Sequence, residues 1–279
     1  MLNHRLMFGS VVSVLGLLSL LTFHSAFASN SSSNVTTEMK FGPYASYIKY
    51  EEPDVMQETG FMIGVTGEFD AHFNTGLMLG ADGSLAGGLV DYESNGTGSI
   101  DNVGDAMAEL RGKIGYDFQL SETARLTPYV GAGYRYLSDM LGGEVSTTGA
   151  GGYDRSSQYF YLPIGASVSL GLQSGWSTGL NVEYDFFIKG QQRSDLGDVV
   201  SGLDTVKHDQ DEGYGLRASV DFSKKLNNFE LTISPFVRYW NIKQSDTKAI
   251  TYSGTPIGVV SYEPKNNSTE IGMMVGVRY

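Results

Sequence analysis

The stretch that decides the fold is Asp105-Ala-Met-Ala-Glu-Leu-Arg-Gly-Lys-Ile-Gly-Tyr-Asp-Phe118. Its even-numbered positions are apolar, aromatic or small, whereas its odd-numbered positions include Glu109, Arg111 and Lys113. Because successive side chains of a β-strand point to opposite faces, this alternation predicts a strand with one apolar and one charged face. The core of a soluble protein cannot accept the charged face, since those groups would be desolvated without enough partners.

The same alternation recurs as far as the C-terminus, in segments of about ten residues. We expect strands at 39–51, 60–70, 75–92, 105–118, 127–136, 159–170, 177–189, 213–222, 231–242 and 268–279. Ten is therefore the predicted number of strands. Eight or twelve remain alternatives if the first or third segment is misread, because the first has an ambiguous parity and the third is long for a membrane span.

The connections between these segments alternate in length. Short ones at 71–74, 121–125, 173–175 and 224–228 alternate with long ones at 52–59, 93–104, 137–158, 190–212 and 243–267. An open sheet edge in hydrocarbon would leave backbone groups unsatisfied, so strands that cross a membrane must close into a barrel. Short periplasmic turns and long extracellular loops are the plan of an outer-membrane barrel. We predict an all-β fold, a transmembrane antiparallel up-and-down β-barrel.

The N-terminal segment predicts export. Arg5 precedes an apolar run at 7–21, and Ala26-Phe27-Ala28 follows as a small-x-small cleavage pattern. The run is short for a membrane span and leads into a polar stretch, which favours a cleaved signal peptide over a membrane anchor. The expected organisation is a signal peptide at 1–28, a short polar leader at 29–37 and a barrel at 38–279, placed in the bacterial outer membrane.

Composition excludes several classes of function. The formal net charge is −12 and no basic run is present, so a nucleic-acid partner is not expected. The chain has no cysteine, which removes disulfides, thiolate metal sites and thiol nucleophiles. Mean hydropathy is −0.15, whereas a helical membrane protein would be far more apolar. No cofactor and no metal site are expected.

Charges on the inward parity of the predicted strands are nearly balanced. We expect a lumen network of seven acidic and six basic residues: Glu68, Asp82, Glu109, Glu183, Asp185, Asp221, Glu270, Arg111, Lys113, Arg135, Arg217, Arg238 and Arg278. Such charges can pair across strands in a narrow lumen, which favours a filled interior over a wide pore. A narrow conduit lined by the same residues remains the alternative.

The chain ends on an aromatic residue at the close of its last alternating segment. Together with the signal peptide and the segment Tyr129-Val-Gly-Ala-Gly-Tyr-Arg-Tyr136, this C-terminus resembles the small outer-membrane β-barrel proteins of Gram-negative bacteria, the opacity, OmpA-like barrel and "porin family" group. The resemblance implies contact with outer-membrane lipid and lipopolysaccharide, and recognition by the outer-membrane assembly machinery through Val275, Val277 and Tyr279. The family's signal expects glycine five residues before the terminal aromatic, where this chain has Met274.

His208 is a candidate catalytic residue. His208 lies in an acidic segment at 204–212, and a carboxylate beside an imidazole can orient it to activate water. The omptins, which are ten-stranded outer-membrane proteases, resemble this arrangement in using an Asp–His pair at the barrel mouth. Asp204 and His208 are therefore the candidates. We favour the simpler interpretation of incidental loop residues, because the second aspartate pair of omptins has no match here.

These observations predict a non-enzymatic barrel with a structural or surface-interaction, adhesin-like role. The long extracellular loops hold most of the irregular sequence available for contact, so a host or cell-surface ligand is the candidate partner. Two alternatives remain open: a narrow porin or channel for small solutes, and an omptin-like surface protease.

Overall fold

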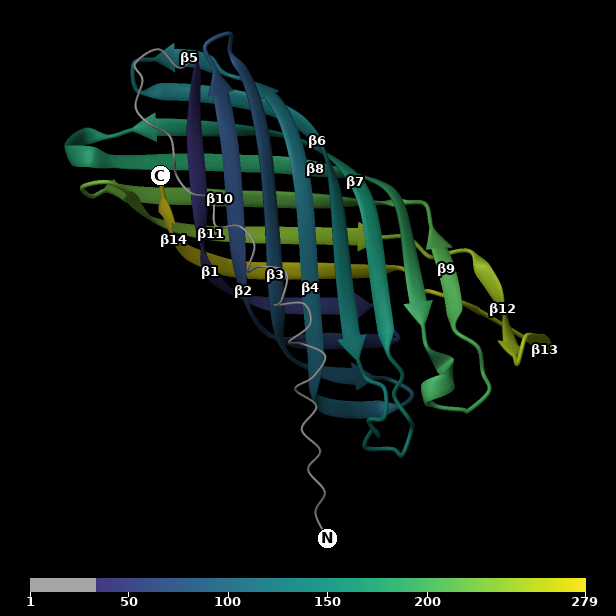
Figure 1. Ribbon diagram of the computed structural model, residues 1–279. Helices are drawn as coiled ribbons and strands as arrows, with labels where there is room; N and C mark the ends of the chain where they lie inside the picture. Colours follow the sequence, from purple (N-terminus) through teal and green to yellow (C-terminus); the bar gives the residue numbers. More distant parts are fainter. Residues whose placement is uncertain (1–33) are drawn as a thin grey trace. The chain divides into compact units, whose positions relative to one another are not determined.

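The computed structural model describes residues 34–279, whose main antiparallel sheet closes on itself (Figure 1). The wall consists of β1 (Val35–Glu52), β2 (Met56–Phe73), β3 (Leu77–Ser94), β4 (Gly98–Tyr116), β6 (Ala124–Met140), β7 (Arg155–Gly171), β8 (Trp176–Ser194), β10 (Gly213–Lys225), β11 (Glu230–Ile242) and β14 (Asn266–Arg278). β14 pairs with β1, from Lys40 opposite Arg278 to Glu51 opposite Asn267, which closes the barrel. The predicted ten strands are confirmed, and eight and twelve are excluded.

Four short strands lie outside this wall. β5 (Phe118–Ser121) continues the line of β4 along β6, and β9 (Val206–Gln210) pairs with the end of β8. β12 (Thr247–Tyr252) and β13 (Thr255–Tyr262) form a separate hairpin in the connection between β11 and β14 (Figure 1). The 3-10 turns η2 (Gln173–Gly175) and η3 (Leu196–Asp198) complete the elements.

No helix within 34–279 is long and apolar enough to span a membrane.

The outward face of the wall carries exposed apolar side chains. Phe61, Ile63 and Leu110 are 71%, 72% and 66% exposed, and each stands on the parity that the sequence assigned to lipid. Such a band would be unfavourable in water, because burying apolar surface is worth about 25 cal/mol per Å². The band is what hydrocarbon contact requires of a barrel whose backbone groups are paired within the sheet.

The strands are longer than the predicted segments. β1 to β4 and β6 to β8 hold 17 to 19 residues each, whereas β10, β11 and β14 hold 13. At about 3.3 Å per residue, the long strands exceed what an apolar band about 25 Å tall requires. They therefore continue beyond the membrane at the end where the long connections lie, which we call the long-loop end. The opposite end, with the tight connections, is the short-turn end.

Several predicted strand and loop boundaries need correction. β1 begins at Val35, inside the stretch assigned to the polar leader at 29–37. β2 begins at Met56, within a predicted loop, and β6 continues to Met140. The predicted loop at 243–267 contains the β12–β13 hairpin. The predicted signal peptide at 1–28 lies outside the described residues.

The long-loop half of the lumen is packed with apolar side chains. One buried cluster gathers around Met62, Val90 and Met107, and a second joins Tyr161 and Trp240 with their neighbours. Met62, Val90, Tyr161 and Trp240 are each 1% exposed. The inward parity is therefore not polar along its whole length, and side chains rather than water fill this half.

Candidate functional site

Two arginines at the centre of the lumen bridge acids from facing strands. Arg217 on β10 donates from Nε to Asp185 Oδ2 and from Nη1 to Glu109 Oε2, both at 2.6 Å. Arg111 on β4 donates from Nη1 to Glu183 Oε1 at 2.5 Å. Glu109 and Arg111 stand on β4 and their partners on β8 and β10, so these contacts cross the lumen. Each acid has a guanidinium partner, as burial of charge requires.

The structure brings twelve of the thirteen lumen residues named from the sequence into ion pairs, and these are Glu68, Asp82, Glu109, Arg111, Lys113, Glu183, Asp185, Arg217, Asp221, Arg238, Glu270 and Arg278. Arg135 differs, since its Nη2 lies 3.4 Å from Met107 Sδ and its guanidinium stands 5.5 Å from the ring centroid of Trp240. Lys40 was missed. It bridges Glu68 at 3.0 Å and Asp221 at 2.9 Å, and the ambiguous parity of the first segment concealed it.

A cavity of about 900 Å³ occupies the short-turn half of the lumen. Its lining includes Lys40, Glu68, Lys113, Asp221 and Arg278, so it is polar and charged on both signs. The apolar clusters of the long-loop half do not line this cavity. The central ion network lies at its inner limit. The lumen therefore has a hollow half and a packed half, separated by the Arg217 and Arg111 network.

The structure does not bring Asp204 and His208 together. Asp204 Oδ2 accepts hydrogen bonds from Thr251 Oγ1 at 2.6 Å and from the Gly254 amide at 2.8 Å. His208 Nε2 lies 3.0 Å from Ser261 Oγ, and its Nδ1 is buried without a hydrogen-bond partner among the described residues. Burial lowers the pKa of His208, because the charged ring would lose its hydration. Among residues 34–279 no carboxylate accepts a hydrogen bond from this imidazole, so Asp204 and His208 do not form the base and orienting acid of a catalytic group.

Sequence reasoning missed the contact between His208 and Ser261. The two residues stand 53 positions apart, on β9 and β13, and both strands lie in stretches predicted to be loops. The apolar and aromatic residues at 257–262 were the available signal for a strand, but they do not alternate with polar residues, and Gly258 interrupts them at a positive φ.

Two residues of the expected assembly signal, Val275 and Val277, lie on β14 at the short-turn end, and Tyr279 directly follows that strand. Val275 and Tyr279 are exposed on the outward face, and the ring of Tyr279 stacks on Phe41 with centroids 6.2 Å apart. Met274, which replaces the expected glycine, points inward and is 4% exposed. Recognition by an assembly machinery stays a prediction.

The sequence matches no family model and no curated protein. Among solved structures, the chain is similar to the outer membrane protease OmpT from Escherichia coli, with a TM-score of 0.63 and 11% identity, over 91% of this chain and 99% of that one. It is also similar to the translocator domain of the autotransporter NalP from Neisseria meningitidis, with a TM-score of 0.43 and 12% identity, over 90% and 89%. At this identity the likeness shows the fold alone. The closed ten-stranded wall with its lipid-facing band is that of an outer-membrane β-barrel protein.

Proposed function

We propose that this barrel is a surface-interaction protein with an adhesin-like role, and that its binding element is the β12–β13 hairpin. The partner is an extended, apolar segment of a protein on a host or neighbouring cell. One observation carries the proposal: the hairpin lies outside the barrel wall and exposes apolar side chains along β13. Val259, Val260 and Tyr262 are 50%, 65% and 51% exposed.

The edge of β13 supports the same role. Within 34–279, β13 pairs only with β12, so its second edge offers unpaired N–H and C=O groups. An extended segment can add to such an edge through main-chain hydrogen bonds, while neighbouring apolar side chains supply contact area. Natural edges are usually blunted by charge or covered, and this one carries no charged residue in 255–262.

The state of the lumen supports a role at the surface over a channel. The central ion network and the buried aromatic cluster fill the passage between the hollow half and the long-loop end. A selective pore needs a continuous hydrated path. A proteolytic role gains no support from His208, whose ring lies against Ser261 rather than a carboxylate.

The test replaces an adjacent pair of exposed valines on β13 with serines. Bacteria that carry the double variant Val259→Ser/Val260→Ser in their outer membrane are expected to attach to epithelial monolayers, and to sediment with one another, at least about tenfold less than bacteria with the unchanged protein. Removing two valines from the contact is expected to weaken binding by about 2–3 kcal/mol, because less apolar surface is buried.

The matched control is Val199→Ser/Val200→Ser, another pair of adjacent exposed valines on a different connection, at 44% and 49% exposed. It is expected to attach as the unchanged protein does, and heat-modifiable migration in gels checks that both variants fold. Equal attachment by all three proteins, or equal loss in the two variants, would contradict the role of the hairpin.

A further inference from the structure

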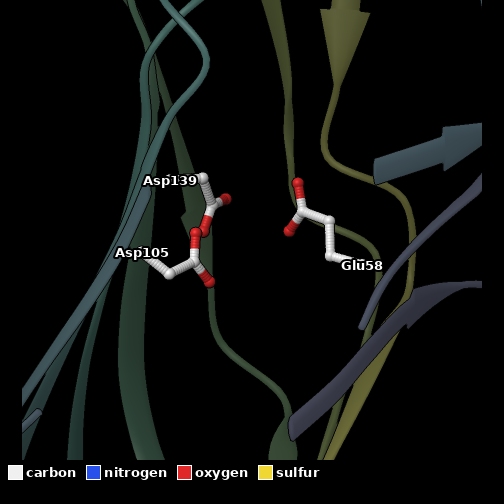
Figure 2. A group of neighbouring side chains, drawn as sticks. All are labelled: Glu58, Asp105 and Asp139. Atoms are coloured by element: carbon white, nitrogen blue, oxygen red, sulfur yellow. The ribbon is translucent and has the colours of Figure 1, made fainter. Parts of the chain in front are cut away.

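Three carboxylates from three strands converge inside the long-loop half of the lumen (Figure 2). They belong to Glu58 on β2, Asp105 on β4 and Asp139 on β6. One oxygen of each lies within 4.8 Å of the others. Figure 2 shows Asp105 and Asp139 side by side, with the carboxylate of Glu58 facing them across a gap.

The register of the sheet makes this arrangement costly for the protein alone. Asp105 and Asp139 are direct cross-strand partners in the ladder between β4 and β6. Like charges placed directly opposite each other destabilise a sheet. The ladder therefore builds a repulsive pair into the wall, and Glu58 adds a third negative group.

Protein groups do not compensate these charges. Glu58 is 2% exposed, and its Oε1, like Oδ1 of Asp105, is buried without a hydrogen-bond partner among the described residues. Within 34–279 none of the three acids forms an ion pair. A buried carboxylate oxygen without a partner is unfavourable, and more so when it is charged.

The nearby arginine is already engaged. Arg155 Nη2 donates to Glu52 Oε1 at 2.5 Å and to Glu263 Oε1 at 2.8 Å. Arg155 therefore stands among two acids that it bonds, Glu52 and Glu263, and the three acids of the cluster, each of which also interacts electrostatically with Arg155. One guanidinium against five carboxylates leaves an excess of negative charge at this point of the lumen.

The space between the carboxylates is a small cavity of about 10 Å³. Its lining consists of the three acids together with Ile48, Tyr50, Val90, Leu137 and Ser157. That volume is close to what one water molecule or one ion occupies. Apolar neighbours exclude bulk water, so a cation at this place would be attracted strongly by the three oxygens.

We propose that Glu58, Asp105 and Asp139 bind one calcium ion. The three acidic ligands offer carboxylate oxygens, which suit hard divalent cations rather than zinc or copper. The three oxygens lie within 4.8 Å of one another, which is no farther apart than two oxygens on opposite sides of calcium at about 2.4 Å each. Magnesium demands near-ideal octahedral geometry and gives up its water reluctantly, so three carboxylates around a small, poorly hydrated cavity suit it less. The bound ion ties β2, β4 and β6 together at the long-loop half of the barrel.

The experiment measures thermal unfolding of the protein refolded in an uncharged detergent without lipopolysaccharide, which itself binds calcium. Millimolar calcium is expected to raise the midpoint by about 5 °C relative to the protein in chelator, and magnesium by less. Titration calorimetry is expected to give one calcium per chain. The variant Glu58→Gln/Asp105→Asn/Asp139→Asn keeps the shape of the cluster and removes its charge.

This triple variant is expected to lose the calcium response. In chelator it is expected to be at least as stable as the unchanged protein, because the repulsion is gone. The matched control is Asp101→Asn, an exposed aspartate on the same strand as Asp105, which is expected to keep the full response. A calcium response that is absent from the unchanged protein, or equal in the triple variant, overturns the proposal and leaves carboxylates that are neutralised by protons.

Discussion

The two halves of the lumen solve the problem of filling a ten-stranded barrel in different ways. The short-turn half keeps a cavity of about 900 Å³ and lines it with ion pairs such as those between Lys40, Glu68 and Asp221. The long-loop half is packed around Met62 and Trp240, each 1% exposed. Charges that share a hydrated cavity are screened and replaceable, whereas charges in a packed interior must each find a partner.

The boundary between the halves is therefore the most demanding place in the barrel. Arg217 stands there with a side chain 7% exposed and contacts Glu109 and Asp185, whose side chains are 6% and 0% exposed. Arg278, in the hollow half, is 22% exposed and shares Asp221 with Lys40. The same residue type thus occupies a site where it is irreplaceable and a site where a neighbour can substitute for it.

Replacing each of these two arginines with alanine gives the largest expected difference in the free energy of unfolding. Arg217→Ala leaves Glu109 and Asp185 buried without their main partner and is expected to lower the free energy of unfolding by about 3–5 kcal/mol. Arg278→Ala is expected to lower it by less than about 1 kcal/mol, because Lys40 still neutralises Asp221. Urea unfolding of the detergent-refolded proteins, followed by heat-modifiable migration, measures both. Equal losses of free energy of unfolding would show that the ion pairs of the two halves contribute equally to stability.

The aromatic cluster gives the next effect. The Trp240 ring packs against Tyr161 with centroids 5.0 Å apart and lies 5.6 Å from the Arg217 guanidinium. Trp240→Ala removes the largest buried side chain of the packed half and is expected to destabilise the barrel by about 3 kcal/mol.

The same variant is expected to open a passage. In planar bilayers the unchanged protein is expected to be silent, whereas Trp240→Ala is expected to show stepwise conductance because water can enter the vacated volume. Trp176→Ala, a 50% exposed tryptophan at the short-turn end, is the control and is expected to remain silent. Stepwise conductance by the unchanged protein would refute the packed half as a barrier.

The hollow half was the more predictable of the two. Period-two alternation in segments such as 105–118 reveals which parity faces lipid, and charges on the other parity then locate the ion pairs. In the packed half the inward residues are themselves apolar, as Met62 and Met107 are, so alternation in polarity does not show which residues meet. Contacts there depend on closure of the barrel, which only the complete register determines.

The long-loop end was harder for a further physical reason. A strand that continues beyond the membrane no longer needs an apolar outer face, so its sequence loses the period-two signal. Glu58 and Asp139 therefore stood in predicted loops at 52–59 and 137–158, although both belong to strands. Neither the acidic cluster nor the contact of His208 with Ser261 could be recognised from spacing along the chain.

His208 gives the smallest expected effect, at the long-loop end. Burial lowers its pKa below the ordinary value of about 6.5, so the unfolded chain takes up this proton more readily than the folded one. The contribution of the neutral ring to stability is complete above about pH 6.5 and declines as the pH falls from there toward the lowered pKa. His208→Gln cannot titrate in this range. When the pH is lowered from 7.5 to 5.5, the thermal midpoint of the unchanged protein is expected to fall by about 1–2 °C more than that of the variant. An identical pH dependence in both proteins would mean that the imidazole is as free to take a proton in the folded barrel as in the unfolded chain.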